Sequence, residues 1–233
     1  MLITHLISGI TKIKKKNNLL YMNQTLIQYS AISEAIPNNT RLTIVTKKHT
    51  MESISCLLEA GHKDFAENYV QEAQDKWHNA LQKYPNINLK LIGRLQSNKI
   101  NDALHLFDEI HSIHSLEIAN KIANKLSENS RTKVFYFQVN VGLESQKSGI
   151  VIKDVMNFLK NSPLLMSGLM CIPPYGECPS PYFLLMQNIK QQADKQFNLC
   201  LKISMGMSGD FQEAIALGSD EVRIGSAILG ERS

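Results

Sequence analysis

Residues 204–230 read SMGMSGDFQEAIALGSDEVRIGSAILG and contain two strand-to-helix connections in direct succession. A short apolar run leads into the glycine-punctuated loop 204–209, and helical periodicity follows over 210–217. Residues 222–224 then form a β-rich run that turns at 225–226, where a further helical turn is expected to begin. Two adjacent units of this kind are typical of an α/β fold.

The helix predicted over 210–217 carries signals at both ends. Asp210 and Glu213 have the spacing of a capping box, in which the first side chain accepts a hydrogen bond from the helix backbone. Gly218 stands where a helix commonly ends. We therefore expect Asp210 to cap this helix.

Both turns of the segment are rich in glycine and serine. Backbone N–H groups at the start of a helix attract anions, and small residues let a phosphate approach the backbone. The alternative is that the glycines only allow tight turns, because loose Gly/Ser patterns often occur without a ligand. Arg223 favours a ligand site, since a strand-borne arginine needs a partner when it is buried.

Strand-like runs alternate with helical runs along the rest of the chain. A helix is predicted over 23–36, and the alternation then continues at a mean spacing of roughly 25 residues, which suits βα units with short connections. This regularity predicts a parallel sheet closed into a (β/α)₈ barrel, with an open doubly wound sheet as the alternative. The eight strand candidates centre on Thr43, Phe65, Leu91, Phe107, Phe135, Leu169, Ile203 and Val222.

Composition limits the classes of protein to consider. With 43% hydrophobic and 20% charged residues, the 233-residue chain resembles an ordinary globular protein, and no low-complexity linker divides it. Residues 23–233 are therefore predicted to form one domain after an N-terminal tail, residues 1–22. The net charge of +4 comes without a basic stripe interleaved with aromatics, so we expect no nucleic-acid partner.

Location and assembly are expectations of the same kind. No apolar run is long enough to span a bilayer, so no membrane partner is expected. The four cysteines lack CxxC spacing, and no His/Cys cluster suggests a metal. Reduced thiols of this kind favour a cytoplasmic protein. We expect a monomer.

Ligands of a (β/α)₈ barrel bind at the carboxyl ends of its strands. The segment 204–230 supplies the ends of the seventh and eighth strands, where phosphate-binding turns often occur. The polar residues predicted at the other strand ends are Lys47, Glu67, Asn68, Arg94, Gln96, Asn98, His111 and Asn140.

Lys47 follows the first predicted strand. Because side chains alternate along a strand, Lys47 shares a face with Val45 and not with Lys48. If that face lines the barrel, apolar walls would lower the pKa of Lys47 and favour the neutral, nucleophilic amine. The alternative is an ordinary solvated lysine at the start of a loop.

These features together suggest pyridoxal 5′-phosphate (PLP). This cofactor has an aldehyde that reacts with a lysine, a phosphate that needs an anion site, and a ring nitrogen that needs a protein partner. A lysine after strand one, an arginine on strand eight and two phosphate turns would supply these three contacts.

Several long motifs occur in one order along the chain. They are VTK at 45–47, FAENYVQE at 65–72, IGRLQSNK at 92–99, VNV at 139–141, KSG at 147–149, GLM at 168–170, SMGMS at 204–208 and VRIGSAILG at 222–230. From about residue 23 to 232, the chain resembles the YggS/PROSC-type pyridoxal phosphate homeostasis proteins.

The resemblance implies a single TIM barrel similar to the N-terminal domain of alanine racemase. It implies that Lys47 holds PLP as an aldimine and that Arg223 faces the pyridine nitrogen. It also implies that two turns contact the phosphate through Ser208, Gly225 and Ser226, and that Asn68 lies near the ring.

The arginine bears on catalysis. A guanidinium can only donate hydrogen bonds, so it keeps the ring nitrogen unprotonated and makes the ring a poor electron sink. Racemases with such an arginine use a second base from another domain, and none is expected here because the sequence ends at Ser233, directly after the eighth unit. We therefore expect a protein of intracellular PLP homeostasis, without strong catalysis, that hands PLP to apo-enzymes. The alternatives are a PLP-dependent racemase-like enzyme and a barrel enzyme acting on a phosphorylated metabolite.

The chain departs from the family pattern at three places. Ala66 replaces the usual glycine, which is a mild change. Leu89 and Lys90 stand where the family usually has Trp-His, which changes either the barrel lining or only its outer packing. The loop 176–181 is short and unlike the usual form, which leaves partner contacts there open.

Overall fold

The computed structural model describes residues 21–144 and 146–230. All its strand pairs are parallel, and the pairing of β4 with β5 closes the sheet into a barrel. Within the described residues, eight strands form the barrel, and β6 is a short addition beside β5. The strands are β1 (Arg41–Val45), β2 (Asp64–Glu67), β3 (Asn88–Leu91), β4 (Glu109–Ile113), β5 (Val134–Asn140), β6 (Ile150–Val151), β7 (Gly168–Cys171), β8 (Lys202–Ser204) and β9 (Glu221–Ile224). The predicted (β/α)₈ barrel is confirmed, and the open sheet is excluded.

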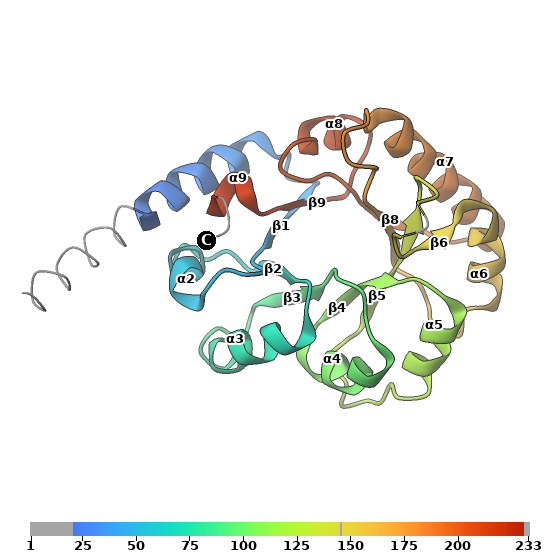
Figure 1. Ribbon diagram of the computed structural model, residues 1–233, viewed down its shortest axis with the longest axis horizontal. Coiled ribbons are helices and arrows are strands. Elements are labelled where there is room, and N and C mark those ends of the chain that lie inside the picture. Colours follow the sequence, from blue (N-terminus) through green and yellow to red (C-terminus); the bar gives the residue numbers. More distant parts are fainter. Residues whose placement is uncertain (1–20, 145, 231–233) are drawn as a thin grey trace, which may run out of the picture.

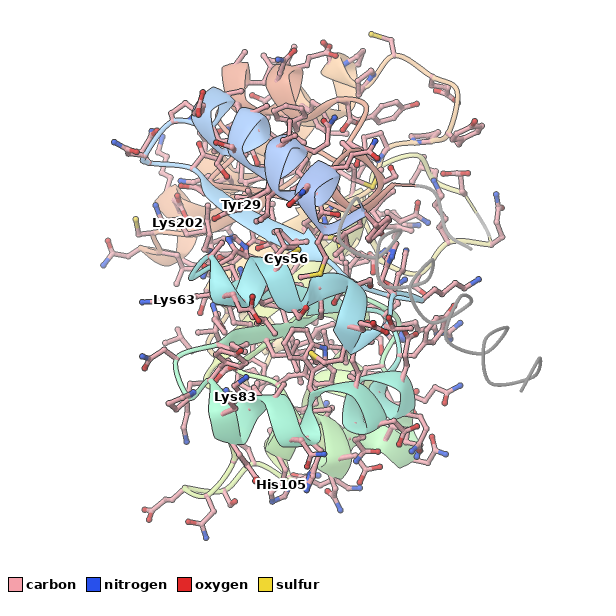
Figure 2. All side chains as sticks on the ribbon, turned by 90° about the vertical axis from the view of Figure 1, so that its left-hand side faces the viewer. Tyr29, Cys56, Lys63, Lys83, His105 and Lys202 are labelled. Atoms are coloured by element: carbon pink, nitrogen blue, oxygen red, sulfur yellow. The ribbon has the colours of Figure 1, made fainter. Side chains whose placement is uncertain are left out.

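Helices surround this ring of strands (Figure 1). The helix predicted over 23–36 is present before β1 but extends over residues 21–35, so it begins within the predicted tail. Residues 1–20 of that tail lie outside the described residues. Figure 2 shows this helix beside α2, with α3 on the other side of α2. The others are α2 (Met51–Glu59), α3 (Val70–Lys83), α4 (Ile100–Leu106), α5 (Leu116–Ala123), α6 (Val155–Asn161), α7 (Ser180–Phe197), α8 (Phe211–Ala216) and α9 (Ser226–Leu229), with 3₁₀ turns η1 (Ser97–Lys99) and η2 (Ile152–Asp154). No helix in the described part of the chain has the length and apolar character needed to cross a membrane.

The ends of α8 confirm one expectation and correct another. Gly218 follows the helix with φ +86°, the left-handed conformation that favours glycine at such an end. Asp210, however, makes no side-chain capping bond to α8. Its Oδ1 accepts a hydrogen bond from the backbone N–H of Met207 at 2.5 Å, because the carboxylate turns back into the loop before the helix. The capping-box prediction is therefore wrong.

The fourth strand begins later than predicted. Phe107 ends α4, where its backbone N–H donates to the Ala103 carbonyl at 3.0 Å, and β4 starts at Glu109. His111 therefore lies within β4 and is fully buried, not placed after the strand. The prediction started the strand too early because strands of the core are recognised by hydrophobic residues, and β4 contains polar ones.

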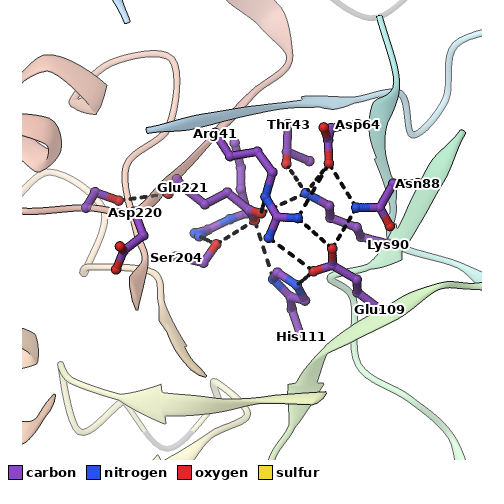
Figure 3. A network of polar contacts seen from close by, with 12 residues as sticks. Arg41, Thr43, Asp64, Asn88, Lys90, Glu109, His111, Ser204, Asp220 and Glu221 are labelled. Atoms are coloured by element: carbon purple, nitrogen blue, oxygen red, sulfur yellow. Dashed lines mark hydrogen bonds and ion pairs between the residues drawn. The ribbon is translucent and has the colours of Figure 1, made fainter. Parts of the chain in front are cut away.

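Lys90 lies inside the barrel. Its Nζ is 2.7 Å from Oε2 of Glu221 and 2.9 Å from Oδ1 of Asp64, and it donates to Thr43 Oγ1 at 2.6 Å. Leu89, one residue earlier, is also fully buried but points to the opposite face of β3. The Leu-Lys pair therefore changes the barrel lining, and Lys90 is its charged member (Figure 3).

Candidate functional site

A cavity of about 420 Å³ lies at the carboxyl ends of the strands. The six residues predicted to bind the cofactor all line it: Lys47, Asn68, Ser208, Arg223, Gly225 and Ser226. They come from the ends of β1, β2 and β9 and from the loop after β8, which are far apart in sequence. The remaining wall is formed by Val45, Ile92, Met170, Ile172, Tyr175, Met207 and Gly209.

Other polar strand-end residues do not join this cavity. Arg94 and Gln96 line a separate hollow beside the start of α5. The side chain of Asn140 instead holds its own loop, donating from Nδ2 to the Glu144 carbonyl at 2.9 Å. Sequence reasoning did not assign the other wall residues to the site, and Tyr175 is the one among them with an ionisable side chain.

Lys47 lies two residues after the end of β1. It is half-buried and lines the cavity together with Val45. The predicted sharing of one face by these two residues is confirmed. Lys48 is exposed and adopts φ +63°, so the chain turns sharply away immediately after Lys47. The turn separates the two adjacent lysines, with one facing the cavity and the other facing solvent.

Glu67 and Lys76 fix the backbone on which Lys47 stands. The Thr46 hydroxyl donates to Oε1 of Glu67 at 2.6 Å, and Lys76 Nζ donates to the Thr46 carbonyl at 2.6 Å. Lys76 also pairs with Glu67 at 2.9 Å, and Trp77 Nε1 donates to the same Oε1 at 3.0 Å. Burial raises the pKa of Glu67, although Lys76 offsets part of this effect. The network holds the residues immediately before Lys47 and Asn68.

The turn from β9 into α9 presents converging donors. The backbone N–H groups of Gly225 and Ala227 donate to Ser208 Oγ at 3.4 and 3.2 Å. A Cβ atom at Gly225 would lie 3.2 Å from the Val45 carbonyl oxygen, so the absence of a side chain keeps this turn open. Two amides and a hydroxyl at one point are the donor types that bind phosphate.

Arg223 is only 3% exposed and has the partners that a buried arginine requires. One Nη donates to Ser204 Oγ at 2.8 Å, and the other donates to the Cys171 carbonyl at 2.8 Å. Burial raises the pKa of the Cys171 thiol to about 12, so this cysteine is an inert neighbour of Arg223. The guanidinium thus forms part of the cavity wall in a fixed orientation.

Asn68 brings an unsatisfied acceptor to the cavity. Its Oδ1 is buried and has no hydrogen-bond partner among the described residues. The Asn68 backbone packs against Gly93, where an added Cβ would lie 2.0 Å from the Asn68 carbonyl oxygen. A buried polar atom of this kind is a position where a ligand donor is expected.

Replacing Gly93 by alanine is expected to destabilise the fold by about 3 kcal/mol, because the backbone that it would strike cannot move aside as a side chain could. Gly209→Ala is the control, since a Cβ at Gly209 meets nothing within 4 Å. Denaturant unfolding of both variants measures the difference. Equal free energies of unfolding for the two variants would show that the contact between Gly93 and Asn68 is not tight.

The family model described as "Alanine racemase, N-terminal domain" matches residues 26–233. The barrel and its cavity therefore place this chain in the class of alanine racemase N-terminal domains. A pyridoxal phosphate homeostasis protein of Synechocystis is 37% identical over 214 residues, which cover 88% of this chain and 97% of that protein. The Homo sapiens protein of the same name is 32% identical over 212 residues, covering 82% and 76%. This chain belongs to the pyridoxal phosphate homeostasis protein family.

Solved structures agree with this assignment. PipY of Synechococcus elongatus, with PLP bound, superposes with a TM-score of 0.80 at 28% identity, covering 88% of this chain and all of PipY. An alanine racemase of Clostridium difficile superposes with a TM-score of 0.71 at 13% identity, covering 88% of this chain and 56% of the racemase. The second likeness shows a shared fold alone.

Proposed function

We propose that this chain binds PLP in the cavity at the strand ends and serves intracellular PLP homeostasis by holding, buffering and delivering the cofactor. The observation that carries the proposal is the meeting of Lys47, Arg223 and the 225–226 turn in one cavity of about 420 Å³. The PLP bound in PipY supports the same ligand for a chain of this fold. The proposed binding domain extends over residues 23–233.

The residues of the cavity suit the chemical groups of PLP. The amides of Gly225 and Ala227 and the Ser208 hydroxyl would hold the phosphate, with Ser226 beside them. Asn68 Oδ1, which is buried without a partner, is available to a donor on the ligand. The aldehyde of PLP forms Schiff bases with amines, and Lys47 supplies the amine that faces the cavity.

Arg223 supports a carrier more than a catalyst. We assign it to the ring nitrogen, toward which a guanidinium can only donate a hydrogen bond. An unprotonated ring withdraws electrons weakly, so it does little to accelerate reactions that place negative charge on a bound amino acid. The proposed recipients of PLP are apo forms of PLP-dependent enzymes. The four free cysteines suit a reducing compartment, and we place the protein in the cytoplasm.

A racemase-like activity is the second candidate, and Tyr175 is the observation that favours it. Its phenol belongs to the same cavity wall as Lys47, and a phenol is a group that can transfer a proton. The Tyr175 side chain is fully exposed, however, so it lacks the buried surroundings that usually tune a catalytic base. Incubation with PLP and single amino acids in deuterated water separates the candidates. We expect no α-proton exchange above that of free PLP, whereas exchange lost in Tyr175→Phe would establish the enzyme.

The phosphate site predicts strong selection of PLP over pyridoxal, which lacks the phosphate. The three donors at the phosphate site, at about 1.5 kcal/mol for each hydrogen bond to a charged group, correspond to an affinity difference on the order of 1,000-fold. Equilibrium dialysis of both compounds measures it, and Ser208→Ala should reduce the selection about tenfold by removing the hydroxyl at the turn. Equal affinity for the two compounds would refute the assignment of this turn to phosphate.

A further inference from the structure

A serine hydroxyl lies between Arg223 and a buried carboxylate. Arg223 donates to Ser204 Oγ at 2.8 Å, and the Ser204 hydroxyl donates to Oε1 of Glu221 at 2.9 Å. Ser204 on β8 and Glu221 on β9 are direct partners in register. The exposed fractions are 0% for Ser204, 1% for Glu221 and 3% for Arg223, so water does not screen the three groups.

The chemistry of the three groups fixes the direction of these bonds. A guanidinium can only donate, so Ser204 must accept from Arg223 and point its single hydrogen at Glu221. Burial alone would raise the pKa of Glu221, but Lys90 and its cationic neighbours lower it to about 2. The carboxylate is therefore ionised and orients the hydroxyl, which in turn presents a lone pair to Arg223.

Cations inside the barrel hold Glu221 in place (Figure 3). Its Oε2 lies 2.7 Å from Lys90 Nζ and 3.0 Å from Arg41 Nε. Glu109, His111 and Glu221 have ligand atoms within 4.8 Å of one another, which are the atom types of a metal centre. Because Lys90 and Arg41 already neutralise the carboxylates, we assign this cluster to orienting Glu221 and not to holding a metal ion.

We propose that Ser204 and Glu221 are positioning residues that orient Arg223 toward the ring nitrogen of PLP. The inference rests on the proposed function, in which Arg223 meets that nitrogen. Two of the five N–H groups of the guanidinium are directed at Ser204 and at the Cys171 carbonyl, which fixes the plane of the group. In a site without water, such orientation decides how well the remaining donors meet a ligand atom.

The test compares PLP with its 1-deaza analogue, in which a C–H group replaces the ring nitrogen. Wild-type protein is expected to prefer PLP, and Ser204→Ala is expected to lose about fivefold of that preference, the equivalent of one hydrogen bond. Ser204→Thr keeps the hydroxyl and should restore the preference. A purely structural role of Ser204 would weaken binding of both compounds equally.

Ser219→Ala is the matched control. Ser219 Oγ is also buried but bonds to backbone atoms, including the Met205 carbonyl at 2.7 Å, so its loss should leave the preference unchanged. If the wild-type protein binds neither compound, the proposed function itself fails. If the wild type binds PLP but shows no preference, or if Ser204→Ala keeps the full preference, only the positioning role is overturned. Should Ser204→Ala not fold, Ser204→Thr and Glu221→Gln provide the comparison, with the preference kept in the first and reduced in the second.

Discussion

Replacing Lys47 by alanine is expected to abolish stable retention of PLP through gel filtration, while the barrel remains folded. Lys47 is half-buried and lines the cavity together with Val45, and the chain turns at the next residue, Lys48. Without this amine, the phosphate turn and Arg223 can bind PLP only non-covalently. We expect the retained cofactor to fall at least about tenfold, as judged by the absorbance of the protein fraction.

Lys48→Ala is the control for this experiment. Lys48 is adjacent in sequence but exposed, and the bond that it makes to Glu72 comes from its backbone N–H, which the substitution preserves. Full retention in Lys48→Ala and loss in Lys47→Ala would assign the attachment to one of two neighbouring lysines. Loss in both variants, or in neither, would contradict the assignment.

Lys90→Met is expected to lower the free energy of unfolding by about 3–5 kcal/mol. Lys90 is fully buried, and its Nζ lies 2.7 Å from Glu221 and 2.9 Å from Asp64. Methionine fills a similar volume but leaves both carboxylates with less positive charge, and Glu221 is only 1% exposed. The cost is therefore that of buried and poorly compensated negative charge.

Denaturant unfolding measures this effect, with Lys63→Met as the control because Lys63 lies on the surface (Figure 2). Adding Glu221→Gln to Lys90→Met removes one of the two carboxylates that lose their contact with Lys90. The double variant should therefore regain part of the lost stability. A change below about 1 kcal/mol for Lys90→Met, as expected of a surface ion pair, would refute the importance of the buried network.

The barrel and the residues at its strand ends could be predicted from the sequence. Alternating apolar runs predict the barrel, and the strand-end rule places Lys47 and Arg223 at one mouth although they are far apart in sequence. Gly225 marks a turn where the backbone must remain accessible. These features depend on spacing and residue type, which are visible without coordinates.

The interior of the barrel could not be read in the same way. Lys90, His111 and Glu221 are polar residues within strands, and only the closing of the barrel brings them together. The polar side chains of Glu109 and His111 concealed the true limits of β4. Asp210 misled for a related reason, since its spacing suits a helix cap but its carboxylate satisfies a closer backbone N–H in the loop.

The apolar part of the cavity was also hidden from sequence reasoning. Met170, Met207 and Tyr175 become cavity residues only through the direction in which their loops and strands place them. Nothing in their residue types separates such a wall from ordinary packing. The polar residues proposed to contact PLP could thus be predicted from the sequence. The apolar residues that enclose them could be identified only from the structure.

Reduction of the PLP-loaded protein with borohydride, followed by peptide mass mapping, tests the central claim most directly. The reagent fixes a Schiff base as a stable secondary amine, so the modified residue is read from the peptide mass. We predict that the pyridoxyl group is found on Lys47. Modification of another lysine, such as Lys48 or Lys99, or no modification at all, would contradict the assignment of this cavity to PLP held by Lys47.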